Sequence, residues 1–534
     1  MLIKTYGAAV QGIDAIKITI ETIASTGATF NMVGLADTAV RESYQRIMAA
    51  VNQSGYDFPR LRFVVNLSPA DVKKEGAAYD LPIAIAILAA SKRITVPQLG
   101  DFMIMGELSL DGSLLPIRGV LPMAILARKC GFRGMIVPCE NAPEAAVVNN
   151  LEVYGVSSLR EVVEFLEGNT SIDPTIVDTR AEFAAHCSGF DVDFSEVKGQ
   201  EVVKRAFEVA CAGGHNILLV GPPGSGKSMM AKRLPSILPP LTLSEALETT
   251  KIHSVAGKLP NGSRLMTRRP FRAPHHTVSP VALVGGGSNP HPGEISLAHN
   301  GVLFMDEFPE FPRTVLEVLR QPLEDNVISI SRAKYSVDYP ASFMLVASMN
   351  PCPCGYYGHP TRQCTCMPGQ VTRYMNRISG PLLDRIDLHV EIEPVEFGHL
   401  ASRESGESSA DIRRRVIAAR NIQQLRYKEE PGVHCNAQMN SRLIHKYAWP
   451  DETGLAQLKE RMEKLRLSAR AFDRILRTAR TIADLDNAEA LPDPSDSAYQ
   501  RSLLDALTAP IKVAHLSEAI SYRTLDRDTY GQTF

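Results

Sequence analysis

A run of eight residues combines glycine, lysine and serine in an order suited to holding phosphate groups. The run fits the pattern G-x-x-x-x-G-K-[ST] and comprises Gly221, Pro222, Pro223, Gly224, Ser225, Gly226, Lys227 and Ser228. In such a loop backbone N–H groups surround a polyphosphate, the lysine reaches its β- and γ-phosphates, and the serine hydroxyl binds Mg²⁺. Residues 216–220 are typical of a strand and residues 229–234 of a helix start. This context argues against a chance glycine-rich turn and predicts a site for ATP or GTP with Mg²⁺.

Polar side chains also end two further apolar runs. Residues 302–305 lead into Asp306 and Glu307, and residues 343–347 lead towards Asn350. Asp306 would hold Mg²⁺, directly or through water, and Glu307 would polarise the water that attacks the γ-phosphate. Taken alone, the two carboxylates are equally typical of a solvated acidic turn, and Asn350 of an Asx-type turn before a proline. The phosphate loop is what favours the catalytic interpretation of the carboxylates.

Four of the nine cysteines lie close together, at Cys352, Cys354, Cys364 and Cys366. Two thiol pairs across a short loop can form the tetrahedral S₄ site that structural zinc prefers. The C-x-C spacing is tighter than the usual C-x₂₋₄-C, and four free thiols are the alternative. A disulfide is disfavoured in a cytoplasmic protein. We therefore predict a structural Zn²⁺ with no open coordination position and no part in catalysis.

Three blocks of sequence would position these residues. Residues 1–167 mix strand-like and helical stretches, with strands expected at 15–20 and 62–67, and residues 168–195 are typical of a linker. Residues 196–395 contain the phosphate loop, the apolar strands and the cysteine insert at 352–366. Residues 396–534 are mostly helical, because apolar residues recur there near helical spacing.

The composition restricts the compartment and the class of protein. A net charge of −2 argues against a wholly basic nucleic-acid coat, although it does not exclude local basic patches. The N-terminus lacks the pattern of a secretory signal, and the longest apolar stretch, residues 81–90, is too short to span a bilayer. We expect a cytoplasmic enzyme without a membrane partner.

Together these motifs resemble those of an AAA+ ATPase from the magnesium-chelatase-related branch, and specifically the ComM/YifB family. The resemblance covers nearly the whole chain, and its most specific runs are residues 270–277, 292–301, 379–387 and 479–485. It implies that Asn350 is sensor 1, that Arg385 is an arginine finger reaching the ATP of a neighbouring subunit, and that Arg470 is the sensor 2 arginine of a helical lid. A finger supplied by a neighbour makes hydrolysis depend on assembly, and the family implies a homo-hexamer.

Both arginine assignments have alternatives. Arg385 stands between Asp384 and Asp387, so an ion pair with one of them within the chain is the alternative to the finger. Arg470 is followed on the same expected helix by further arginines at roughly one-turn spacing, at Arg474, Arg477 and Arg480. Some of these four must lie on the surface or pack within the lid.

The first block resembles the proteolytic domain of Lon protease at residues 105–112 and 115–120. Lon chemistry needs a serine nucleophile activated by a lysine. The serine position falls on Ala78 and the lysine position falls near Leu121. We therefore expect the fold without peptidase activity. The expected fold class is α/β, with an N-terminal Lon-protease-like α+β domain, a P-loop AAA+ core with a zinc-binding insert, and a C-terminal helical lid.

Basic residues near two expected hairpins are candidates for contact with DNA. Arg272, His275 and His276 lie where this branch inserts a hairpin, and Arg332 and Lys334 lie in a second hairpin expected at residues 327–337. In ring motors of this type both hairpins face the pore, where cations can follow a phosphate backbone. For any single one of these residues, a solvated side chain or an intersubunit ion pair is as good an explanation.

The resemblance implies a hexameric, ATP-driven DNA motor that promotes branch migration in homologous recombination and natural transformation. Its partner would be single-stranded or branched DNA. The alternative is a chelatase-type ATPase that remodels a protein partner during metal insertion. The Lon-like block and the cysteine insert argue against that alternative, because neither belongs to the pattern of that motor subunit.

Overall fold

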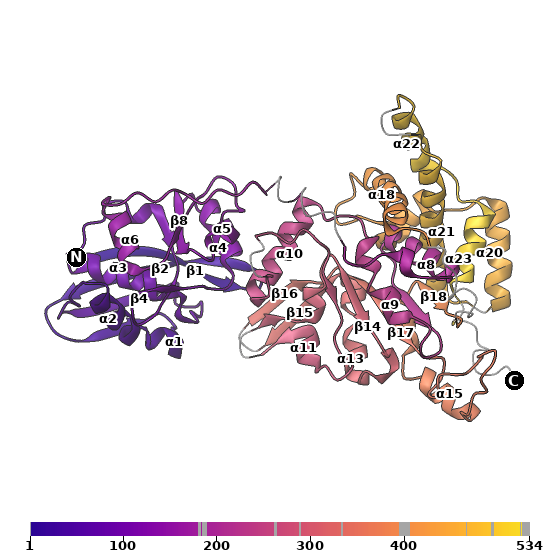
Figure 1. The fold of residues 1–534 in the computed structure, drawn as a ribbon, viewed down its shortest axis with the longest axis horizontal. Helices are drawn as coiled ribbons and strands as arrows, with labels where there is room; N and C mark the ends of the chain where they lie inside the picture. Colours follow the sequence, from indigo (N-terminus) through magenta and orange to yellow (C-terminus); the bar gives the residue numbers. More distant parts are fainter. Residues whose placement is uncertain are drawn as a thin grey trace.

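Three parts follow one another along the long axis of the molecule (Figure 1). The structure is a computed structural model, and it describes residues 2–179, 183, 190–260, 264–287, 290–332, 335–394, 406–465, 467–492, 496–523 and 525. A sheet with helices forms the N-terminal part, a second sheet with two hairpins forms the central part, and helices form the C-terminal part. The expected α/β fold class is therefore confirmed. None of the helices within these ranges has the length and apolar character needed to cross a membrane.

A seven-stranded mixed sheet organises the N-terminal part in the order β3-β4-β2-β1-β5-β8-β9. Its strands are β1 (Leu2–Gln11), β2 (Asp14–Ser25), β3 (Phe30–Val33), β4 (Arg62–Ser68), β5 (Phe102–Ile104), β8 (Gly134–Pro138) and β9 (Glu152–Val156). The strands expected at residues 15–20 and 62–67 are confirmed as β2 and β4. Helix α3 (Asp80–Ala90) is buried at all eleven residues, as expected of a helix that is apolar on every side.

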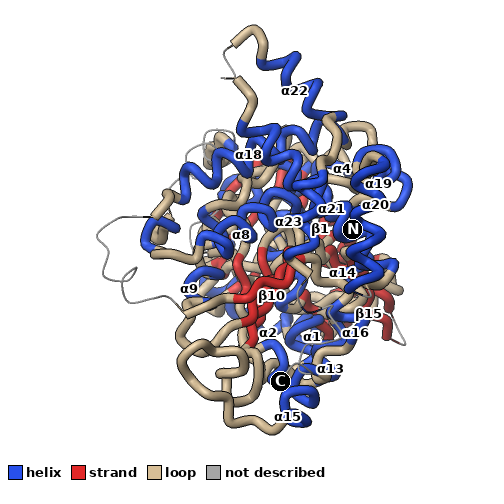
Figure 2. Tube along the Cα trace, turned by 90° about the vertical axis from the view of Figure 1, so that its right-hand side faces the viewer, coloured by secondary structure: helices blue, strands red, loops and turns tan. Residues whose placement is uncertain are grey.

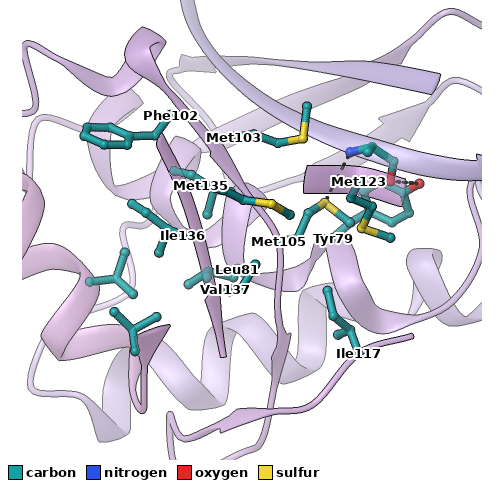
Figure 3. Packing of buried hydrophobic residues seen from close by; sticks show 14 of the residues in the cluster. Tyr79, Leu81, Phe102, Met103, Met105, Ile117, Met123, Met135, Ile136 and Val137 are labelled. Atoms are coloured by element: carbon teal, nitrogen blue, oxygen red, sulfur yellow. Dashed lines mark hydrogen bonds between the residues drawn. The ribbon is translucent and has the colours of Figure 1, made fainter. Parts of the chain in front are cut away.

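Buried side chains of this part pack together where β1 pairs with β5 (Figure 3). The backbone N–H of Ala8 on β1 donates to the sulfur of Met105 at 3.3 Å, and the Tyr79 hydroxyl donates to the carbonyl of Ala8 at 3.0 Å. Tyr79 is 2% exposed, so this bond satisfies a phenol that water cannot reach. The hydroxyl of Tyr79 is therefore paired although apolar side chains surround it.

Five parallel strands form the central sheet in the order β11-β14-β17-β10-β18. They are β11 (Phe271–Arg272), β14 (Val302–Met305), β17 (Met344–Met349), β10 (Ile217–Val220) and β18 (Leu388–Glu391). Every residue of β10, β14 and β17 is buried, which explains why these strands are continuous apolar runs in the sequence. Because all strands run the same way, the segments that follow them meet at one edge of the sheet and the segments that precede them meet at the other.

Two hairpins extend from the central part. Strand β12 (Gly285–Gly286) pairs with β13 (His291–Pro292), and β15 (Val327–Arg332) pairs with β16 (Tyr335–Pro340). The hairpin expected at residues 327–337 is confirmed, with Arg332 opposite Tyr335. Lys334 and the side chain of Arg332 lie outside the described residues.

The C-terminal part consists of helices α18 (Ser409–Arg426), α19 (Ser441–Tyr447), α20 (Glu452–Leu465), α21 (Ala469–Glu489), α22 (Tyr499–Thr508) and α23 (Val513–Ser521). Helix α8 (Glu201–Gly213), which precedes β10, packs against α18 and α21 and joins this part to the central sheet (Figure 2). A buried charge network ties the helices together. Asp484 accepts two bonds of 2.7 Å from Arg426, bonds of 3.0 and 2.8 Å from Arg480, and one of 2.9 Å from Asn436.

The N-terminal part is joined to the central part through helix α10 (Leu243–Ala256), which packs on α4 (Val120–Lys129). Glu144 accepts hydrogen bonds from the Ser254 hydroxyl at 2.5 Å and from the Leu121 backbone N–H at 2.9 Å. Burial raises the pKa of Glu144 and these bonds oppose the shift. Lys251 adds an ion pair with Asp14 at 2.6 Å. Leu121, near which the lysine position of Lon is predicted to fall, is thus part of the contact between the two parts.

Removing the carboxylate of Asp484 is expected to destabilise the helical part strongly. Asp484→Ala leaves Arg426 and Arg480 buried without their counter-charge, which typically costs about 3–5 kcal/mol. Arg414→Ala is the matched control, because Arg414 forms an exposed pair with Asp411 one turn away. We expect a fall in the apparent melting temperature for the first variant only. Equal melting curves would contradict the assignment of Asp484 as a structural centre.

Candidate active site

The eight-residue loop connects β10 to α9 (Lys227–Ala231) at the carboxyl edge of the central sheet. Gly224 and Gly226 have φ values of +81° and +87°, which a residue with a side chain rarely adopts. The Lys227 amine donates to the carbonyls of Gly221 and Pro222 at 2.7 and 2.8 Å. Burial lowers the pKa of Lys227, and Asp306 opposes the shift. The loop therefore holds a buried cation that a phosphate group would neutralise.

The two residues predicted to bind Mg²⁺ are in direct contact. Asp306, which follows β14, accepts a hydrogen bond from the Ser228 hydroxyl at 2.5 Å. The Ser348 hydroxyl on β17 donates to the other oxygen of Asp306. A hydroxyl and a carboxylate beside a phosphate loop are the hard oxygen ligands that Mg²⁺ takes together with phosphate oxygens. The residues present therefore fit Mg²⁺ with a bound triphosphate.

Glu307 lies beside this site in the left-handed conformation, with φ +54°. Its backbone N–H donates to Asp306 at 3.0 Å, and its carboxylate lies 3.1 Å from Nδ1 of His276. Asn350 accepts a hydrogen bond from Lys227 at 3.3 Å. The carboxylate and the amide predicted to position the attacking water thus border the same cavity, of about 260 Å³, as Lys227 and Asp306.

The predicted arginine finger, Arg385, and the predicted sensor 2 arginine, Arg470, do not line this cavity. Arg385 donates to the Pro381 carbonyl at 2.7 Å and pairs with Glu324 of α14 (Pro322–Asp325), so its partner is neither Asp384 nor Asp387. Arg470, near the start of α21, pairs with Asp384 at 3.4 Å and its side chain is 65% exposed.

Both arginines border a larger cavity of about 480 Å³. The segment that carries Arg385 precedes β18, and Leu388 pairs with Ile217 at the start of β10. The larger cavity therefore lies at the amino edge of the sheet, opposite the phosphate loop.

A buried carboxylate joins the C-terminal helices to this amino edge. Asp387 is bound by Arg474 of α21, accepts from the Asn216 backbone N–H at 2.9 Å, and lies 3.8 Å from His215. Burial would raise the pKa of Asp387, but the charge of Arg474 and the neighbouring His215 hold it well below its usual range. Asp387 thereby fixes the position of Arg385, two residues earlier, relative to α21.

The four cysteines of the insert lie together, with ligand atoms all within 4.8 Å of one another. The sulfur of Cys352 is 3.3 Å from that of Cys354 and 3.7 Å from that of Cys364, and the Cys354 N–H donates to Cys366 at 3.4 Å. A tetrahedral zinc with Zn–S bonds of about 2.3 Å separates its sulfurs by about 3.8 Å. The thiolate set therefore fits a structural zinc with four protein ligands.

Of the remaining predicted DNA contacts, His276 lies beside Glu307, which lines the nucleotide cavity. Arg272 on β11 forms two hydrogen bonds with Glu294, at 2.6 and 2.8 Å. The rings of His275 and His276 are 4.1 Å apart, and His276 faces Glu307. Neither histidine is on the β12–β13 or β15–β16 hairpin.

Sequence reasoning missed His276 and Ser348 as neighbours of the catalytic carboxylates. The contact with Ser348 could have been predicted from strand pairing. The parallel register that pairs Met305 with Ala347 places the next residues, Asp306 and Ser348, side by side. The contact of His276 with Glu307 had no signal, since it joins two loops that are distant in the sequence.

Comparison with known proteins places the chain in a family. A profile described as magnesium chelatase, subunit ChlI, matches residues 193–400, and two further ChlI profiles match residues 20–141 and 406–495. A Salmonella typhimurium protein called YifB is 43% identical over 524 residues, which cover 97% of this chain and 96% of that protein. Competence protein ComM of Haemophilus influenzae is 42% identical over 525 residues, which cover 98% and 97%.

The chain belongs to the ComM/YifB family. Its central part is the magnesium-chelatase-type AAA+ domain, a membership that implies ATPase activity with ATP and Mg²⁺. An archaeal Lon protease of Thermococcus kodakarensis is 25% identical over 138 residues, which cover 25% of this chain and 21% of that protein. The expected Lon-like N-terminal fold is therefore confirmed.

Lys227→Ala is expected to abolish nucleotide binding, because it removes the cation of the phosphate loop while the rest of the loop remains. Binding of a fluorescent ATP analogue measures the loss directly. Lys232→Ala is the control, because Lys232 follows α9 and does not line the nucleotide cavity. Retained nucleotide binding or ATP hydrolysis in Lys227→Ala would contradict the assignment of the loop.

Proposed function

We propose that this chain is an ATP-driven, ring-forming DNA motor that promotes branch migration during recombination, including the integration of incoming DNA in natural transformation. The observation that carries the proposal is the separation of the phosphate loop and Arg385 at opposite edges of one parallel sheet. The motor is proposed to act in the cytoplasm as a homo-hexamer, the state implied by the family.

The chemistry at the carboxyl edge would be hydrolysis of ATP. Lys227 binds the β- and γ-phosphates, and Ser228 and Asp306 hold Mg²⁺, which neutralises charge on the phosphate oxygens. Glu307 orients and polarises the attacking water, and Asn350 hydrogen-bonds to that water or to the γ-phosphate. Among the described residues, none that lines this cavity carries a guanidinium, which could stabilise the charge that spreads over the γ-phosphoryl group in the transition state.

A neighbouring copy would supply that charge. Arg385 and Arg470 lie on the same edge of the molecule, and both border the larger cavity. In a ring, this edge of one subunit faces the phosphate loop of the next, so both arginines would act in trans. Their partners within the chain, Glu324 and Asp384, are carboxylates that a γ-phosphate can replace.

The hairpins are the proposed DNA-contacting elements. Arg332 ends β15, and Lys334 stands between β15 and β16 in the sequence but lies outside the described residues. Cations at the end of such a hairpin would follow a phosphate backbone in the pore of a ring. We keep Arg272, His275 and His276 as weaker candidates, because Arg272 is paired with Glu294 and His276 with Glu307.

The relatives support the DNA substrate over a protein substrate. A relative with 42% identity over nearly the full length is named a competence protein. The alternative, a chelatase-type ATPase that remodels a protein, rests on the ChlI-type profiles. Proteolysis would need a nucleophile and a base at Ala78 and Leu121, whose side chains offer neither.

The proposal is tested on a synthetic three-stranded or four-way DNA junction. The purified chain with ATP is expected to move the branch point, and the same DNA is expected to stimulate ATP turnover. Glu307→Gln is expected to bind ATP normally but to hydrolyse it about 10²–10⁴-fold more slowly and to leave the junction unmoved, because it lacks the residue that polarises water. ATP turnover that is indifferent to single-stranded and branched DNA would contradict the motor and favour the protein-remodelling alternative.

A further inference from the structure

The cysteine insert is in contact with the nucleotide site and is not a remote appendage. Pro353, between the cluster residues Cys352 and Cys354, lines the nucleotide cavity together with Lys227 and Asp306. Cys352 itself is completely buried. Pro353 therefore forms part of the cavity wall, and its neighbours on both sides are cysteines of the cluster.

A second contact joins the insert to the phosphate loop itself. Gly355 has φ +84°, and a Cβ built on it would lie 2.6 Å from Cδ of Pro223. That separation is too short for any real Cβ, so only glycine allows the backbone of the insert to approach the loop this closely. The backbone of Gly355, directly after Cys354, thus packs against the ring of Pro223 in the phosphate loop.

The third contact runs through Asn350. This residue accepts a hydrogen bond from Lys227 at 3.3 Å and stands two positions before Cys352. On the far side of the insert, Tyr374 of α15 (Pro368–Met375) contacts the backbone of Asn350 and lines the same cavity. Asn350, just before the insert, and Tyr374, in the helix that follows it, therefore both line the nucleotide cavity.

We propose that a zinc ion in the cysteine cluster and a nucleoside triphosphate in the phosphate loop stabilise each other's binding. With zinc bound, the four thiolates hold Pro353 and Gly355 against the loop and fix Asn350; without it, these three contacts loosen. The inference rests on the proposed function, because it needs both an ATP site and a zinc site. Coupling between two sites is reciprocal, so nucleotide must also slow the loss of zinc.

The chain offers a matched pair of variants for the first test. Gly355 and Gly358 both lie in the insert with positive φ, +84° and +74°, but no atom lies within 4 Å of a Cβ built on Gly358. Gly355→Ala and Gly358→Ala therefore impose similar backbone strain, and only the first pushes against Pro223. Neither removes a thiolate.

We expect Gly355→Ala to weaken binding of a fluorescent ATP analogue by about tenfold, within the usual range of coupling between sites. Its zinc content should stay at about one ion per chain. Gly358→Ala should keep the parent affinity, and melting curves of both variants confirm folding. Equal nucleotide affinity in the two variants would overturn the inference.

The second test removes the metal from the full-length parent chain. Stripping zinc with a chelator is expected to weaken nucleotide binding, and adding zinc back should restore it. In the reverse direction, bound nucleotide should slow zinc transfer to a chromogenic chelator. A parent that binds both ligands, with the same nucleotide affinity before and after stripping, would overturn the coupling and leave the motor intact. A parent that holds no zinc would overturn this inference and leave the motor intact, whereas a parent that binds no nucleotide would contradict the proposed function as well.

Discussion

The parallel direction of the strands in the five-stranded sheet separates the phosphate loop from Arg385 within a single copy of this chain. In a parallel sheet all carboxyl ends lie at one edge, so the phosphate loop, Asp306 and Asn350 meet there. Arg385 precedes β18 and lies at the other edge, with Arg470. Strand β10 has four residues, so about 13 Å of sheet separates the two edges. Under the proposed function, each copy would contribute its phosphate loop to one hydrolytic site and its Arg385 to the next.

The other parts of the molecule are attached to these two edges. At the amino edge, the Asp387–Arg474 pair connects the segment of Arg385 to α21. At the carboxyl edge, the cysteine insert packs on the phosphate loop through Pro353 and Gly355. The N-terminal part reaches the central part through Glu144 and Ser254 on α10. A change in the nucleotide site thus has short physical routes to the other parts of the chain.

Much of the fold was predictable because its signals are local. The apolar runs of β10, β14 and β17 are continuous since parallel strands are buried on both faces, and the polar residues at their ends mark the site. The cysteine cluster was predictable from spacing alone. The partner of Arg385 was not, because an arginine between two aspartates has no sequence signal for a glutamate sixty residues earlier. The contacts Gly355–Pro223 and His276–Glu307 were missed for the same reason: they join loops whose approach depends on tertiary packing.

The most direct measurement of shared hydrolytic sites is ATP turnover by mixed subunits. Lys227→Ala lacks the phosphate-loop cation and Arg385→Ala lacks the finger, so neither variant alone should hydrolyse ATP. Mixed in varying ratios, they should recover part of the activity, because an intact loop on one copy can meet an intact Arg385 on its neighbour. No recovery at any ratio, with both variants folded and assembled, would contradict the account and leave Arg385 as a partner of Glu324 within its own chain.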